Sequence, residues 1–136
     1  MKLRNLATLL LVFASFSFNA LATRAADAER GARLYDSRCG ACHSIEQNRI
    51  GPRHRGVFGR MAGTQGGYDY SQALVDSKIL WDESSLDLWL TNPQTLIPGQ
   101  KMGFRIRKAE DRLDIIAFLR SLAEKGERHP PGDGDF

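Results

Sequence analysis

With 136 residues, of which 26% are charged, the chain has room for one domain at most. It carries 19 basic and 16 acidic side chains, but neither a basic stripe nor the base-stacking aromatic residues typical of nucleic-acid-binding proteins. The composition predicts a small globular protein with no nucleic-acid partner.

Residues 1–22 have the three parts of a secretory signal peptide. Lys2 and Arg4 supply positive charge, residues 6–18 are almost wholly apolar, and residues 20–22 form a small-x-small cleavage site. An uncleaved membrane anchor is the alternative, but the apolar run is shorter than the ~20 residues that a spanning helix needs. We expect export and cleavage after Ala22, with a later cut near Ala28 as the alternative.

A helix is predicted to follow directly and to run towards Cys39. Asp27 suits its N-cap, and Glu29 lies in the first turn, where the helix dipole favours an anion. Gly31 and Tyr35 share one face because they lie four residues apart. A glycine inside a helix costs up to ~1 kcal/mol relative to alanine, so we expect another element to pack closely at Gly31.

The string Cys39-Gly40-Ala41-Cys42-His43 is typical of a c-type haem attachment site. Its two thiols are spaced to bond the two vinyl groups of one haem, and the following imidazole can then lie under the iron. Three alternatives compete with this interpretation. They are a disulfide, a thiol–disulfide oxidoreductase and a structural zinc site, but no βαβ pattern flanks the motif and no second cysteine pair exists.

The segment after the motif has the composition of an irregular loop. Between residues 50 and 67 it holds six glycines, one proline and three arginines, and few apolar residues. Such a loop cannot form its own core, so we expect it to wrap around the haem. The elements expected after it are a short helix over 71–75, an extended stretch over 79–81, a helix capped by Asp82 and stopped by Asn92-Pro93, a loop over 96–104, a helix over 109–123 and a flexible tail over 127–136.

The second axial ligand of the iron has to come from elsewhere in the chain. Met61 can instead fill a gap in the core, His54 lies between two arginines and is expected to be solvated, and His129 lies in the tail. Met102 follows a Pro-Gly turn between two predicted helices, which can hold its thioether against the iron. Local features thus favour Met102, with an open or His-ligated site as the alternatives.

Beyond the haem motif, the sequence resembles class I cytochromes c, and among them the mitochondrial-like bacterial group, from about residue 27 to residue 123. The matching pieces are Cys39-Gly40-Ala41-Cys42-His43, Gly51-Pro52, Gly56-Val57-Phe58-Gly59-Arg60, Tyr68-Asp69-Tyr70, Trp81, Asn92-Pro93, Ile97-Pro98-Gly99-Gln100-Lys101-Met102 and Asp114-Ile115-Ile116-Ala117-Phe118-Leu119.

This resemblance implies an all-α domain over residues 23–126, in which the N- and C-terminal helices cross and loops wrap one haem c bound through Cys39 and Cys42. It implies His43 and Met102 as axial ligands, and the carbonyl of Pro52 as the acceptor of the Nδ1 proton of His43. Three further positions match residues that contact a haem propionate in the family: Arg60, Tyr70 and Trp81. The alternative is that Arg60 is solvated and that the two aromatic side chains belong to the core.

Several positions depart from the family pattern. Trp89 stands where a tyrosine is usual, Gln100 where a threonine is usual and Leu74 where an asparagine is usual, and the segment over 44–50 is short. These changes alter the polar surroundings of Met102. Most of the surface lysines with which mitochondrial members dock acidic partners are also missing, so the resemblance does not identify partners.

The function expected from the resemblance is one-electron transfer by a monomeric periplasmic carrier, with the iron cycling between Fe(III) and Fe(II). Its partners would be a donor and an acceptor redox protein that bind transiently, with membrane contact only through membrane-bound partners. The chain supplies no acid–base pair for catalysis, so we expect no enzyme activity. The alternative is a haem-bearing subunit of a periplasmic dehydrogenase or sulfur-oxidising complex.

Overall fold

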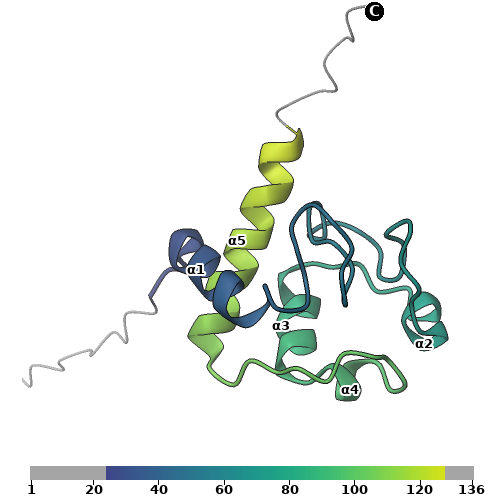
Figure 1. Ribbon diagram of the computed structural model, residues 1–136. Coiled ribbons are helices and arrows are strands. Elements are labelled where there is room, and N and C mark those ends of the chain that lie inside the picture. Colours follow the sequence, from purple (N-terminus) through teal and green to yellow (C-terminus); the bar gives the residue numbers. More distant parts are fainter. Residues whose placement is uncertain (1–23, 128–136) are drawn as a thin grey trace, which may run out of the picture.

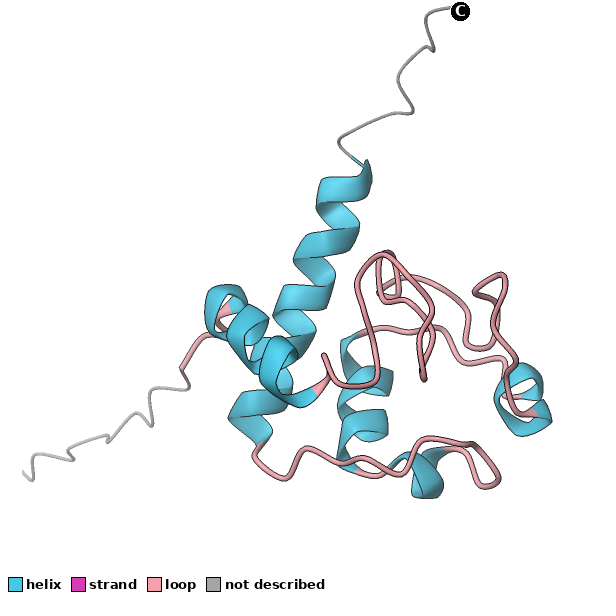
Figure 2. Cartoon of the chain, viewed as in Figure 1, coloured by secondary structure: helices cyan, strands magenta, loops and turns pink. Residues whose placement is uncertain are grey.

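The computed structural model describes residues 24–127, so the predicted signal peptide and the tail after Glu127 lie outside the described residues. The regular elements of this part of the chain are all helices (Figure 1), which confirms the all-α prediction, and a single antiparallel bridge joins Met61 and Leu80. Figure 2 shows how much of the remainder is loop. The helices are α1 (Ala28–Arg38), α2 (Gln72–Asp76), α3 (Glu83–Thr91), α4 (Pro93–Leu96) and α5 (Ala109–Glu127).

Helix α1 begins where the sequence predicts. The carboxylate of Asp27 accepts hydrogen bonds from the N–H groups of Glu29 and Arg30, both at 3.0 Å. The helix packs across α5, as Figure 1 shows. Gly31 faces this crossing, where a Cβ added to it would lie 1.9 Å from the carbonyl oxygen of Asp114. The predicted close approach at Gly31 is therefore confirmed.

A buried ionic cluster lies beside the same crossing. The carboxylate of Asp114 is fully buried and accepts hydrogen bonds from the N–H of Asp27 at 2.7 Å and from the guanidinium groups of Arg24 and Arg30. Burial alone would raise the pKa of Asp114, but these hydrogen bonds outweigh it and hold the pKa below its ordinary value. The cluster thus ties the segment before α1 to α5.

Helices α3 and α4 follow one another in the chain, with only Asn92 between them. Asp82 caps α3 in a capping box with Ser85, and α3 ends at Thr91, both as predicted. No helix was predicted between the stop at Asn92-Pro93 and the loop over 96–104, but Pro93 begins α4. A proline at the first helical position loses no hydrogen bond and has a helical φ already, so the residue that ends one helix starts the next.

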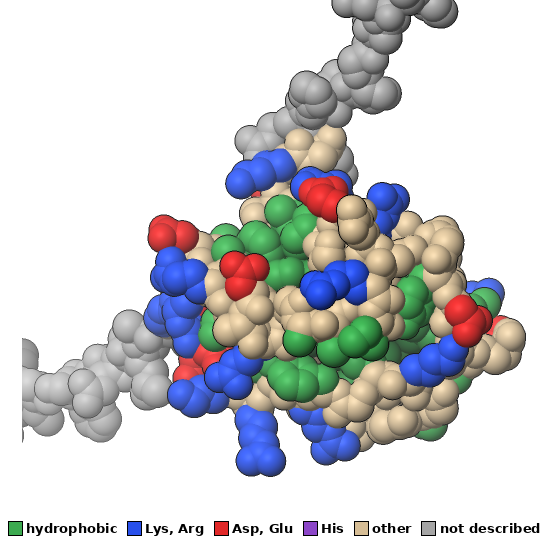
Figure 3. Space-filling view, in the orientation of Figure 1, with side chains coloured by type: hydrophobic (Ala, Val, Ile, Leu, Met, Phe, Trp, Pro, Cys, Tyr) green, Lys and Arg blue, Asp and Glu red, His purple; other side chains and the backbone are tan. Residues whose placement is uncertain are grey.

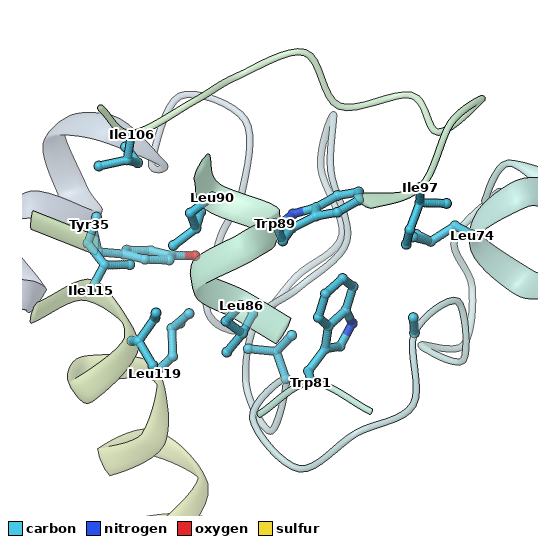
Figure 4. Packing of buried hydrophobic residues seen from close by; sticks show 13 residues of the cluster. Tyr35, Leu74, Trp81, Leu86, Trp89, Leu90, Ile97, Ile106, Ile115 and Leu119 are labelled. Carbon is cyan, nitrogen blue, oxygen red and sulfur yellow. The ribbon is translucent and has the colours of Figure 1, made fainter. Parts of the chain in front are cut away.

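The long loops are held by main-chain hydrogen bonds. The N–H of Gly59 donates to Trp81 at 2.7 Å, and the N–H of Ala62 donates to Ile79 at 2.7 Å. Within residues 24–127, no helix is long and apolar enough to cross a membrane. The buried hydrophobic side chains come from α1, α2, α3, α5 and these loops (Figure 4), and most of them line the cavity described next.

Candidate haem site

A cavity of about 590 Å³ opens among the loops, α3 and α5. Its apolar walls include Trp81 from the extended stretch and Trp89 from α3, whose ring centroids are 5.2 Å apart (Figure 4). Leu86 from α3 and Leu119 from α5 line the cavity as well. All eight site residues predicted from the sequence line this one cavity: Cys39, Cys42, His43, Pro52, Arg60, Tyr70, Trp81 and Met102.

Cys39 and Cys42 are presented by a turn that follows α1. The N–H groups of Cys42 and His43 donate to the carbonyl of Cys39 at 3.0 and 2.8 Å, and both thiols are free. Burial raises the pKa of Cys39 to about 11, and Cys42 adds to this rise. A thiol–disulfide oxidoreductase needs the opposite shift. Among residues 24–127 no three Cys, His, Asp or Glu side chains are placed to hold a metal ion, so the zinc alternative finds no site there either.

His43 is oriented by the contact that the resemblance implied. Its Nδ1 lies 2.9 Å from the carbonyl oxygen of Pro52, so the Nδ1–H donates there and Nε2 remains as the nitrogen for a metal. Burial lowers the pKa of His43, although the bond to Pro52 opposes this, and the neutral ring is the form that binds metals. A Cβ added to Gly51 would lie 2.1 Å from His43 Cε1, so only glycine fits there.

The prediction that His54 is solvated is wrong. Its ring stacks on that of His43 with 4.0 Å between centroids, and its Nδ1 is buried without a hydrogen-bond partner. Burial lowers the pKa of His54 well below its ordinary value, and His43 and Arg60 lower it further. The neighbours Arg53 and Arg55 are exposed, whereas the ring between them packs inward against Tyr35 and His43. The polarity of its neighbours therefore gave a false indication for His54.

Met102 lines the cavity from the loop that follows α4, and the candidate ligands His54 and Met61 line it too. Met61 is 38% exposed at the cavity margin and does not fill a gap in the core. His129 lies outside the described residues. One residue near Met102 was missed as a site residue, namely the buried Gln100, whose side chain bonds to the main chain of Met102.

Arg60 brings a cation to the cavity. Its guanidinium donates to the carbonyls of Arg55 and Arg53 and to Gln65 Oε1, and no carboxylate among residues 24–127 forms an ion pair with it. Burial lowers its pKa, which shows that the charge is incompletely solvated. A half-buried cation of this kind is suited to an anionic group inside the cavity.

These features fit a haem. The walls of the cavity are apolar, and the two cysteine thiols lie in its lining. The imidazole of His43, with its Nε2 free, and the thioether of Met102 line it too. Arg60 adds a cation that forms no ion pair with a carboxylate among residues 24–127. A flat apolar macrocycle with two vinyl groups, an iron and two propionates matches each of them. The residues that would hold it are Cys39, Cys42, His43, Met102 and Arg60.

Comparison with known proteins also indicates a haem protein. The family model for cytochrome c matches residues 28–123. Cytochrome c of Euglena viridis is 46% identical over 101 residues, which cover 72% of this chain and 99% of that protein. Cytochrome c of Kluyveromyces lactis is 40% identical over 95 residues, covering 67% and 86% of the two chains.

Among solved structures, cytochrome cH from Methylobacterium extorquens superposes with a TM-score of 0.67 at 39% identity, covering 70% of this chain and 98% of that one. In sequence and in fold, this chain belongs to the class I monohaem cytochromes c, and Cys39 and Cys42 are the pair through which it holds its haem c.

Proposed function

We propose that the chain is a periplasmic electron carrier in which His43 and Met102 are the two axial ligands of the haem iron. The observation that carries the proposal is that these side chains, from segments far apart in the sequence, line one cavity. When bound, haem c supplies an iron that takes up and releases one electron. An imidazole and a thioether together fill both axial positions, so we propose that the chain transfers electrons without transforming a substrate.

The cavity walls support a raised reduction potential. Trp81, Trp89 and Leu86 are buried and apolar, and an apolar shell disfavours the more highly charged ferric state. A thioether ligand acts in the same direction. The uncompensated cation of Arg60, which we assign to a propionate, adds to this effect. Pro52 in turn keeps the ring of His43 in one orientation in both oxidation states.

We propose that redox partners bind at the mouth of the cavity. Ile50 and Phe104 line this mouth and are 75% and 46% exposed. Arg38 and Lys101 line it too, and exposed cations follow Phe104 at Arg105, Arg107 and Lys108. Figure 3 shows hydrophobic side chains in the middle of one face, with Lys and Arg along its left and lower margins and some Asp and Glu among them. An apolar centre with a cationic rim suits small, transient contacts with acidic surfaces of a donor and an acceptor.

The proposed periplasmic location is supported by the signal-peptide pattern over residues 1–22. The fold also favours cleavage after Ala22 over a cut after Ala28. The later cut would remove Arg24, which bonds to the buried Asp114, and Asp27, which caps α1. The mature chain proposed here therefore keeps both anchors.

The test uses the full chain produced with a haem-attachment system. The ferric protein should show the weak red absorption band that reports an iron–methionine bond, and Met102→Ala should abolish it. Met61→Ala is the matched control, because Met61 lies at the margin of the same cavity, and it should keep the band. Survival of the band in Met102→Ala would refute the ligand assignment.

Whether the chain works alone is a separate measurement. We expect the native protein, released from the periplasm of its source, to elute from a size-exclusion column as a monomer. Co-elution with a larger dehydrogenase or sulfur-oxidising enzyme would instead assign it the role of a haem-bearing subunit.

A further inference from the structure

Met102 lies in a segment with little regular backbone support. Residues 97–102 follow the short helix α4 and turn at Gly99, whose φ is +90°. Within this segment the N–H of Gln100 donates to the carbonyl of Ile97 at 3.3 Å, which is a long hydrogen bond. Because no helix or strand fixes the backbone at Met102, side chains have to provide the hydrogen bonds that do so.

Gln100 provides them. Its side chain is only 5% exposed. Its Nε2 donates to the carbonyl oxygen of Met102 at 2.6 Å, and its Oε1 accepts from the N–H of the same residue. An amide has one donor group and one acceptor, and Gln100 uses both on the main chain of Met102. The threonine usual at this position in the family is too short to make both bonds.

A second amide supports the first. Gln94, on α4, donates from Nε2 to the carbonyl of Gln100 at 3.2 Å and accepts at Oε1 from the N–H of Gly99 at 3.2 Å. Two glutamines thus connect α4 to Met102 in series. The neighbouring ion pair between Lys101 and Asp69 has Nζ and Oδ2 2.9 Å apart, but both side chains are exposed, and such pairs contribute little.

We propose that Gln100, supported by Gln94, is a positioning residue that keeps Met102 on the iron and slows its release. The proposal rests on the proposed ligation by Met102. Gln100 stands where the family usually has a threonine, so this proposal gives that departure a function. In place of a hydroxyl beside the methionine, Gln100 supplies two direct hydrogen bonds to the main chain of Met102, which we call the clamp. Loss of the clamp should populate the state in which Met102 has left the iron.

The experiment measures the binding of free imidazole to the ferric protein, since imidazole can occupy the sixth position only after Met102 leaves. Gln100→Leu removes both hydrogen bonds at similar volume. Its apparent affinity for imidazole should rise roughly 5- to 30-fold, as expected from losing two hydrogen bonds, with a weaker red band at elevated temperature. Gln94→Ala, at an exposed position, should shift the affinity in the same direction by less. Gln72→Leu, on exposed α2 surface, is the control and should bind imidazole as the wild type does.

The outcomes separate the two proposals. If Met102→Ala keeps the red band of the wild type, the ligation itself is wrong. If Met102→Ala loses the band while Gln100→Leu and Gln94→Ala bind imidazole like the wild type, the ligation stands and the clamp is overturned. Should Gln100→Leu fail to fold, Gln94→Ala decides the question, because its side chain lies on the surface.

Discussion

Replacing Gly31 by alanine tests the crossing of α1 and α5. The added Cβ would lie 1.9 Å from the carbonyl oxygen of Asp114, 2.6 Å from its carbonyl carbon and 3.0 Å from Phe118 Cβ. Two of these three atoms belong to the backbone of a helix, so no change of side-chain rotamer can relieve the overlap. The helices have to move apart, and the buried cluster around Asp114 has to move with them.

Two opposing effects set the magnitude. Alanine is favoured over glycine inside a helix by up to ~1 kcal/mol. Overpacking a buried contact destabilises by about 1–3 kcal/mol, and an overlap with backbone belongs at the upper end. We therefore expect Gly31→Ala to lower the free energy of unfolding by about 2 kcal/mol.

The assay is denaturant unfolding of the ferric holoprotein, followed by far-ultraviolet circular dichroism at pH 7. Gly126→Ala is the matched control, because Gly126 lies in α5 and a Cβ there meets nothing within 4 Å. The control should be as stable as the wild type or slightly more stable. A Gly31→Ala variant that is equally stable would refute the close-approach argument.

Three further predictions concern the acidic cluster, the buried histidine and the N-terminus. The pKa of Asp114 is lower in the folded than in the unfolded chain, so its contribution to stability is complete above the ordinary value of 3.8 and is lost as the pH falls through the folded pKa. Asp114→Asn should therefore lower the urea midpoint of unfolding at pH 7. Below pH 4 the midpoint of the variant should fall less steeply with pH than that of the wild type, and an equally steep fall would contradict this assignment. His54→Leu removes a buried nitrogen that lacks a partner, so it should stabilise the protein by about 1 kcal/mol in urea unfolding at pH 7, whereas a clear loss of stability would show that Nδ1 is satisfied. Mass spectrometry of the exported protein should place the first residue at Thr23, and a chain beginning at Glu29 would show that the anchors Arg24 and Asp27 are dispensable.

Local chemistry made much of the fold predictable. The caps at Asp27 and Asp82 follow from side chains that bond N–H groups two or three residues away, and such bonds need no knowledge of the rest of the chain. Gly31 indicated a close neighbour in a different way, because a glycine inside a helix lowers its stability and is therefore expected where another element leaves no room for a side chain. The motif at residues 39–43 defined the chemistry of the cavity before its walls were known.

Features that depend on the path of a loop were not predictable. The prediction for His54 was wrong because the path of the loop, and not the polarity of the neighbouring residues, brings its ring against Tyr35 and His43. The clamp by Gln100 needs a turn that brings an amide back onto the main chain two residues later. Pro93 starts a second helix because the backbone is extended at Asn92, whose φ is −162° and ψ is 97°, and such a single-residue break is not visible in the sequence pattern.

The burial of Cys39 has a consequence for the order of assembly. The nucleophilic form of cysteine is the thiolate, and a pKa of about 11 leaves very little of it at neutral pH. In the unfolded chain the same thiol has its ordinary pKa of 9.0, which gives it roughly a hundredfold more thiolate. Covalent bonding to the haem is therefore expected while the polypeptide is still open, so that the cofactor is built in during folding and not inserted afterwards.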